Sequence, residues 1–226
     1  MKRLPWIFLF ISFSIAASGQ RNADYGIFGG ISSYMGDINP SRLFYSPLPA
    51  GGIFYRYNFH PRHALRADLF LGGLRGNDLD FKNDFQQERA ASFTGMTGEL
   101  ALQFEFNFLP YTTAGKLWDW SPYFAAGAGV ALILSPELSV QPVIPFSGGI
   151  KVNVYKNMGL ELEYGFRKSF YDNFDGLKDE MIDPVDYAWL HNNDWYSFFG
   201  IGFTWKIYNK LAGCPAYSDE DGKRRR

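Results

Sequence analysis

The sequence predicts an all-β fold: an eight-stranded antiparallel up-and-down transmembrane β-barrel with short periplasmic turns, longer external loops and a periplasmic C-terminal tail. Two patterns predict it. Apolar and polar residues alternate with period two in successive segments, and the connections between these segments alternate between short and long. Period-two alternation is typical of strands, and an even number of strands with unequal connections is typical of outer-membrane barrels.

The clearest strand runs from Gly98 to Phe108. Leu100, Leu102 and every second residue onward are apolar, while most of the residues between them are polar. A helix would scatter these residues around its circumference, so one face of a strand is apolar and the other polar. Seven further segments follow the same alternation or are spaced by small residues: 24–35, 53–59, 65–71, 123–133, 150–154, 160–167 and 197–208.

The connections fall into two sets. One set contains tight turns at 60–63 and 156–157 and a moderate connection at 110–121. The other set contains the longer connections 37–48, 75–92, 134–141 and 169–194. Short periplasmic turns and long external loops are the usual arrangement in the outer membrane, so we expect both termini in the periplasm.

Composition excludes several classes of protein. The 226 residues carry 22 Lys+Arg and 23 Asp+Glu, a net charge of -1, which gives no basic field for nucleic acid. A single Cys excludes a disulfide scaffold and a cysteine zinc site. With 19% aromatic residues and 24 Gly, the composition favours strands over disorder.

The first residues are typical of a secretory signal peptide. Lys2 and Arg3 precede an apolar stretch from Leu4 to Ala17, and small residues follow at the expected cleavage site before Gln20. An uncleaved membrane helix is the alternative, but the stretch is shorter than the roughly 20 residues a span needs. We therefore expect a signal peptide at 1–19, a barrel at 20–208 and a periplasmic tail at 209–226.

A soluble lipocalin-like barrel or a β-sandwich also alternates, with its apolar face inward. Alternation alone does not say which face is inside. Three features favour the membrane: large apolar residues on one face, opposite charges on the other, and aromatic residues at strand ends. These aromatic residues are Tyr25, Tyr57, Phe59, Tyr111, Tyr123, Tyr155, Trp195 and Tyr208.

If the polar faces point inward, charged side chains fill the lumen. An eight-stranded barrel has room only for side chains, so these charges should pair with one another and leave no water-filled pore. The expected interior network consists of Arg56, Arg66, Asp68, Glu99, Glu105, Lys151, Glu161, Glu163 and Arg167, with Lys206 as a further candidate.

No catalytic or metal site emerges from the sequence. His60 and His63 fall in an expected turn, and His191 lies near Asp186 and Asp194 without a serine nucleophile beside it. The acidic residues in 172–186 lack the regular oxygen spacing of a calcium loop. We expect a protein that is not an enzyme, with no cofactor, no metal and no small-molecule substrate.

The expected tail departs from barrels that stop at their last aromatic residue. It contains Cys214, an acidic triplet at 219–221 and a basic end at 223–226. A lone cysteine in an oxidising compartment has no partner in its own chain. Cys214 is therefore either an incidental free thiol or half of an intermolecular disulfide with a partner.

Several motifs together resemble those of PorG-like barrels of the type IX secretion system, a DUF6089-type family. They are the signal peptide, the first strand leading into 34–40, the 193–196 entry to the last strand, and the tail around Cys214. Gly36, Asp37 and Asn39 match the family motif, and we expect them to shape a turn. The resemblance implies an outer-membrane anchor for the periplasmic ring, with a PorK-like lipoprotein and a PorN-like protein as partners.

Two functions from different classes remain open. The first is a structural component of that secretion machine, acting through its periplasmic side and tail. The second is a general small outer-membrane barrel for adhesion, surface shielding or small-ligand binding, acting through its external loops. An enzyme built on His191 is a third, weaker alternative.

Overall fold

The computed structural model describes residues 23–36, 38–39, 42–135, 137–170 and 195–207. The expected signal peptide, most of the last long connection and the tail lie outside these residues. Within the described residues, no helix has the length and hydrophobicity of a membrane span.

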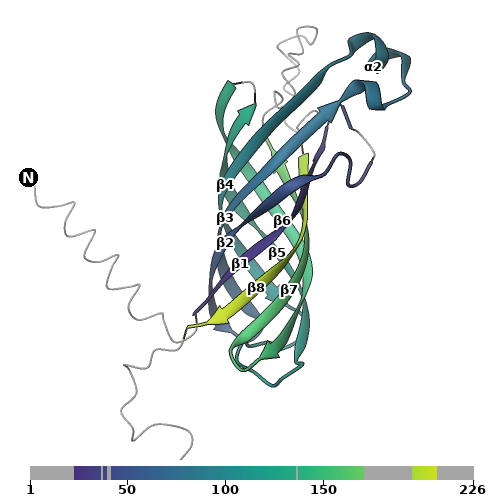
Figure 1. The fold of residues 1–226 in the computed structure, drawn as a ribbon. Coiled ribbons are helices and arrows are strands. Elements are labelled where there is room, and N and C mark those ends of the chain that lie inside the picture. The colour runs from purple at the N-terminus through teal and green to yellow at the C-terminus, as the bar shows by residue number, and fades with distance from the viewer. Residues whose placement is uncertain (1–22, 37, 40–41, 136, 171–194, 208–226) are drawn as a thin grey trace, which may run out of the picture.

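Eight strands and two short helices make up the described chain (Figure 1). In order they are β1 (Ala23–Met35), β2 (Leu48–His60), β3 (His63–Asn77), η2 (Asp78–Asp80), α2 (Asp84–Arg89), β4 (Ser92–Asn107), β5 (Trp120–Ser135), β6 (Glu137–Tyr155), β7 (Met158–Ser169) and β8 (Trp195–Lys206). Each strand pairs antiparallel with its sequence neighbours, and β8 pairs with β1 to close the barrel. The predicted fold class is confirmed.

The strands are strongly tilted. Paired residues traced from Gly159 of β7 through every other strand return to β7 at Ser169, ten residues further along. This stagger over eight strands corresponds to a tilt of about 40° from the barrel axis. The lumen of such a barrel is only wide enough for side chains, so its contents decide whether anything passes through.

The apolar face points outward. On β4, Leu100 and Leu102 are 64% and 52% exposed, whereas Glu99 and Glu105 are 1% and 0% exposed. A soluble barrel would bury the leucines and expose the glutamates. The alternation therefore has the orientation of a membrane barrel.

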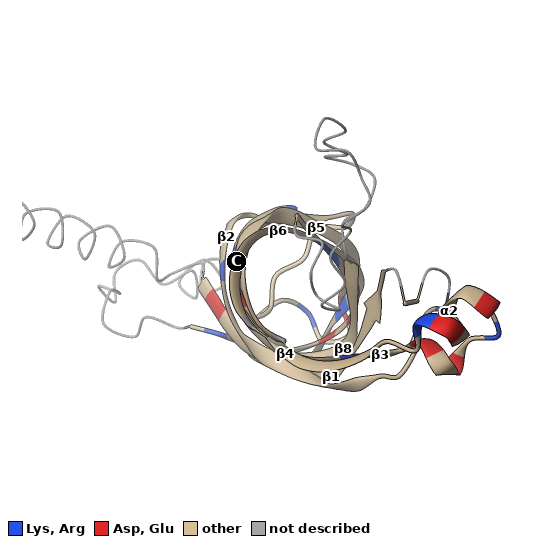
Figure 2. Cartoon of the chain, turned by 90° about the horizontal axis from the view of Figure 1, so that it is seen from above, with Lys and Arg blue, Asp and Glu red and all other residues tan. Residues whose placement is uncertain are grey.

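The barrel has two distinct ends. β1 begins and β8 ends at what we call the terminal end, at the bottom of Figure 1, together with the tight β2–β3 and β6–β7 turns. The opposite end, which we call the loop end, carries the β1–β2 connection and the β3–β4 connection with η2 and α2. Seen along the axis, α2 lies outside the ring of strands (Figure 2).

One expected loop is wrong. Residues 134–141 are the tip of a long β5–β6 hairpin, whose pairing reaches Ser135 and Glu137. Leu134 and Leu138 pair across it and are 54% and 66% exposed, so the outward apolar alternation continues to the tip. The 75–92 loop is also shorter than expected, because β3 extends to Asn77.

Inward glycines make room for large side chains. A Cβ added at Gly26 would lie 2.3 Å from Cζ of the Phe54 ring. One added at Gly159 would lie 2.7 Å from the hydroxyl oxygen of Tyr111. Large side chains of the lumen occupy the space that these glycines leave free.

Candidate functional site

The first half of the lumen, toward the terminal end, holds a charged cluster centred on Arg56. Its guanidinium donates to Glu161 through two nitrogens, at 2.7 and 2.8 Å, and to Glu105 at 3.0 Å. The hydroxyl of Thr204 donates to Glu161 at 2.6 Å. Arg56 is only 1% exposed, so this bidentate arrangement compensates for the removal of the charges from water.

Lys151 extends this cluster on the opposite wall. Its ammonium pairs with Glu105, donates to Asn107 at 3.1 Å and lies 4.2 Å from the ring centre of Tyr123. Glu105 therefore accepts from two cations that lie on β2 and β6. Strands far apart in the sequence are joined through the lumen.

Arg66 forms a second cluster next to the first. It pairs with Asp68 at 2.8 Å and with Glu163 at 2.6 Å. Gln103 donates to Asp68, and Tyr123 donates to Glu163, both at 2.6 Å. These residues come from β3, β4, β5 and β7.

The second half of the lumen is mainly aromatic, and here the sequence analysis was incomplete. The guanidinium of Arg167 lies over the adjoining rings of Phe70 and Phe198, at 4.7 and 5.5 Å from their centres, and 3.4 Å from Glu99. Tyr196 donates to Glu99 at 2.6 Å. Above them, a buried cluster closes the loop end, with Tyr34, Ile38, Leu74, Phe93, Ile133 and Val143 among its members.

The nine charged residues expected in the interior all lie there, each in at least one ion pair. Lys206 lies 3.8 Å from Asp24, a carboxylate that the sequence analysis left out of the network. The aromatic half was missed although the pattern extends to it. Phe70 follows Arg66 and Asp68 on the same face of β3.

The β4–β5 turn closes the terminal end. Tyr111 and Thr113 of this turn are buried, with the Tyr111 hydroxyl donating to Asn153 and the Thr113 hydroxyl to Asp24, both at 2.8 Å. Burial, aided by the carboxylate of Glu161, raises the pKa of Tyr111. The expectation that Tyr111 and Tyr123 belong to an outer aromatic girdle is therefore wrong.

The same turn contains a strained residue. The N–H of Trp118 donates to the carbonyl of Asn153 and the N–H of Asn153 to the carbonyl of Asp119, both at 2.9 Å. This two-against-one pairing is a β-bulge whose first position favours glycine. Trp118 occupies it with φ 66 and is 68% exposed.

The β1–β2 and β3–β4 connections form a hydrogen-bonded segment at the loop end, which we call the cap. Asn39 is fully buried, and its side chain donates to the carbonyls of Tyr34 and Arg42 and accepts from the Arg42 N–H. The N–H of Gly36 donates to the Asn39 carbonyl at 3.2 Å. Gly36 and Asn39 thus shape this loop, while Asp37 lies outside the described residues.

The β3–β4 connection of the cap is held by Asp78. Its buried carboxylate accepts from Arg89 at 2.6 and 2.8 Å and from the Ala91 N–H at 3.1 Å. Burial alone would raise the pKa of Asp78, but these hydrogen bonds outweigh burial and lower it. Tyr45 donates to Asp80 at 2.7 Å, and burial together with that bond raises the pKa of Tyr45 to about 12.

This arrangement of paired charges and packed rings favours a structural role for the barrel over a role as a channel for solutes. Ion-paired charges lie in one half of the lumen and packed rings in the other, with buried side chains toward both ends. Among the described residues, no group of three or more His, Cys, Asp and Glu side chains is placed to hold a metal ion. His191 and Cys214 lie outside the described residues.

Comparison with known families identifies the chain. The model of a domain of unknown function, DUF6089, matches residues 1–216. The chain belongs to the DUF6089 family. Comparison of this DUF6089 chain with curated protein sequences gives no match.

Solved structures share the fold of this DUF6089 barrel at low sequence identity. Neisserial surface protein A (NspA) is 10% identical, with a TM-score of 0.53, over 82% of this chain and 97% of that one. Ail of Yersinia pestis is 14% identical over 81% and 97% of the two chains, with a TM-score of 0.43. OprG, an outer-membrane protein of Pseudomonas aeruginosa, is 10% identical over 83% and 98%, also with 0.43. The likeness to NspA shows a shared barrel fold.

Proposed function

We propose that this protein is a non-enzymatic anchor in the outer membrane, and that it serves the type IX secretion system by tethering the periplasmic ring. The observation that carries the anchoring role is the filled lumen. A barrel with paired charges in one half and packed rings in the other contributes a rigid attachment point rather than a route for solutes.

The outer surface supports a membrane location. On β4 the outward apolar residues run from Phe106 to Met96, and the next outward residue toward the loop end is Thr94. At about 3.3 Å per residue and a tilt of about 40°, that run is about 25 Å tall, which matches the apolar band of outer-membrane barrels.

Aromatic clusters lie toward both edges of this band. Tyr25 stacks with Trp205 at 5.7 Å, and Phe106 packs against Phe108 at 5.3 Å, toward the terminal end. Toward the loop end, Phe44, Phe146, Tyr164, Phe166, Trp195 and Phe199 form a chain of ring contacts. Aromatic side chains favour the two membrane–water interfaces.

The secretion role rests on the motif resemblance and on membership of the DUF6089 family. In this proposal the terminal end faces the periplasm, where the tail with Cys214 meets the PorK-like lipoprotein and the PorN-like protein. The buried Asn39 fits the resemblance as a residue that shapes the first external loop.

Truncation after Tyr208 tests the secretion role. We expect the truncated barrel to assemble in the outer membrane, as judged by heat-dependent gel mobility, while export of type IX cargo is lost. A matched Cys214→Ser variant separates a disulfide from other contacts of the tail. Normal cargo export by the truncated protein contradicts tethering through the tail.

A surface-binding role is the second candidate, and one observation favours it. The cap exposes Leu79 and Phe85, which are 55% and 64% exposed, on a segment that projects beyond the ring of strands (Figure 2). Under this alternative, Leu79→Ser with Phe85→Ser abolishes surface binding, and truncation after Tyr208 has no effect.

A further inference from the structure

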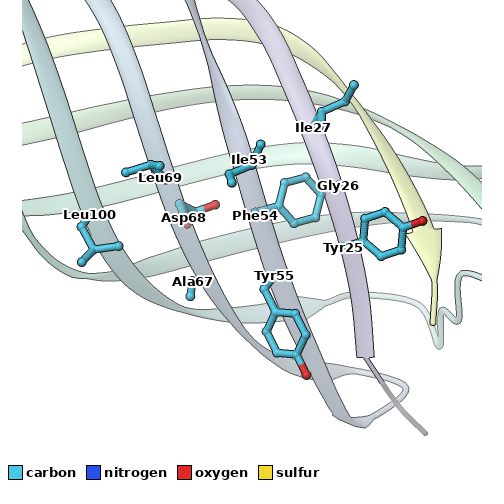
Figure 3. Close-up of a pocket in the computed structure, with 10 residues that line it drawn as sticks. All are labelled: Tyr25, Gly26, Ile27, Ile53, Phe54, Tyr55, Ala67, Asp68, Leu69 and Leu100. Carbon is cyan, nitrogen blue, oxygen red and sulfur yellow. The ribbon is translucent and has the colours of Figure 1, made fainter. Parts of the chain in front are cut away.

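A groove of about 380 Å³ opens on the outer wall of the barrel (Figure 3). Outward side chains of β1, β2, β3 and β4 form most of its walls, among them Tyr25, Ile53, Tyr55, Leu69 and Leu100. The lining also includes Gly26, Phe54 and Asp68, which are buried on the lumen side of the wall. This volume lies in the range of small-molecule sites. The wall on this side is therefore hollowed.

Ala67 accounts for the hollow. It is a small residue in a row of large outward ones, since Leu65, Leu69 and Leu71 on the same strand are 39%, 46% and 55% exposed. Its paired neighbours on either side are Tyr55 and Leu102. The space that a larger side chain would fill at position 67 therefore lies between the bulky side chains of Tyr55 and Leu102.

The depth of the groove decides what fills it. Ala67 pairs with Leu102 and Leu69 pairs with Leu100, and both leucines lie in the middle of the apolar run of β4. A groove at that depth faces the hydrocarbon of the bilayer rather than water or a soluble protein. Its occupant is therefore apolar.

We propose that this groove binds one acyl chain of a phospholipid from the leaflet at the terminal end. A partner strand has no free edge to pair with, because the barrel is closed. A transmembrane helix packs best on small, flat surfaces, whereas isoleucine, leucine and tyrosine side chains project around this groove. A single flexible chain fits between them.

Two phenols orient the lipid. Tyr25 and Tyr55 pair across β1 and β2 and remain 49% and 43% exposed. Their rings lie on the side of the groove nearer the strand ends (Figure 3). A phenol hydroxyl donates hydrogen bonds, so these two can contact the ester or phosphate oxygens of a lipid whose chain enters from that side.

Photolabelling tests the proposal. The barrel is reconstituted in vesicles containing phosphatidylethanolamine with a diazirine at the middle of one acyl chain, and labelled peptides are identified by mass spectrometry. We expect labelling of peptides containing Ile53 and Leu69 to exceed that of the β5 peptide containing Ala128 several-fold. Ala67→Phe fills the groove and should abolish this excess.

Ala128 provides the matched control. It pairs with Leu102 in the same row as Ala67, faces outward and does not line the groove. Ala128→Phe should leave the labelling at Leu69 unchanged, and both variants should show wild-type heat-dependent mobility. Uniform labelling around the wild-type barrel, or equal loss in both variants, overturns the proposal.

Two further outcomes discriminate between occupants and test the phenols. Cross-links between two copies of the chain at Leu69 would assign the groove to a homo-oligomer and overturn lipid binding. Tyr25→Phe with Tyr55→Phe keeps the shape of the groove and removes both hydroxyls. We expect that variant to label equally with phosphatidylethanolamine and diacylglycerol probes, whereas the wild type prefers phosphatidylethanolamine.

Discussion

Arg56 is the residue whose loss should most weaken the barrel. It is 1% exposed and makes three charge-assisted hydrogen bonds, two to Glu161 and one to Glu105. Removing one partner of a buried ion pair costs 3–5 kcal/mol, because the remaining charge is left without compensation. Arg56→Met keeps much of the side-chain volume, so we expect the free energy of unfolding to fall by about 4 kcal/mol.

Urea unfolding in phospholipid vesicles, followed by tryptophan fluorescence, measures this change. Arg75→Met is the matched control, because Arg75 is exposed on the outer face of β3, and it should alter stability by less than about 0.5 kcal/mol. Glu105 still has Lys151 after the substitution, so Glu161 carries most of the penalty. Adding Glu161→Gln to Arg56→Met should therefore recover about 2 kcal/mol, half of the loss.

One result would refute this reasoning. If Arg56→Met and Arg75→Met unfold at the same urea concentration, the carboxylates of Glu105 and Glu161 are solvated in the barrel. Water would then reach the lumen, and the filled interior on which the anchoring role depends would be wrong.

Three other predictions concern the β4–β5 turn, the cap and the filled lumen. Trp118→Gly relieves the left-handed conformation at the bulge and should raise the free energy of unfolding in detergent by about 1 kcal/mol; a loss of stability there contradicts the assigned strain. The lowered pKa of Asp78 means that its ionised form stabilises the cap above the ordinary aspartate pKa and that this contribution is lost as pH falls through the folded value. Acid titration of the Ala91 amide resonance should report that loss, and Asp78→Asn should abolish the transition. In planar bilayers the purified protein should give no steady conductance steps, and reproducible steps would show an open lumen.

The sequence predicted the fold because barrel strands carry their pattern locally. Glu99, Gln103 and Glu105 alternate with leucine and phenylalanine on β4, and no long-range knowledge is needed to assign them to one face. The same alternation placed Arg56 and Glu161 in the lumen. Which cation meets which carboxylate depends on register across the barrel, and sequence alone does not give that register.

The sequence analysis was incomplete or wrong at several aromatic residues and at the β5–β6 hairpin. Phe70 and Phe198 face inward beside Gly72 and Gly200 of their own strands, and the sequence analysis missed them because it listed only charged residues for the lumen. Tyr111, which was expected among the outer aromatic residues at strand ends, lies inside because the β4–β5 turn folds into the end of the barrel. The β5–β6 hairpin was shortened because exposed apolar residues such as Leu138 continue to its tip, where a polar loop was expected.

The distribution of polar groups argues for function at the surfaces of the barrel. In the lumen, Arg66 pairs with Glu163 and Asp68, and Glu163 also accepts from the Tyr123 hydroxyl, which leaves these charges little capacity to bind a passing solute. Rearranging them would expose buried charges to an apolar environment at a cost of several kcal/mol each. Hydrogen bonds between distant segments hold both ends, such as Thr113 to Asp24 at the terminal end and Tyr45 to the carbonyl of Asn77 at the loop end. Any partner must therefore meet the cap, the terminal-end turns, the tail or the membrane-facing wall, and these are the surfaces that the tail truncation, the Leu79 and Phe85 variants and the Ala67 variant separate.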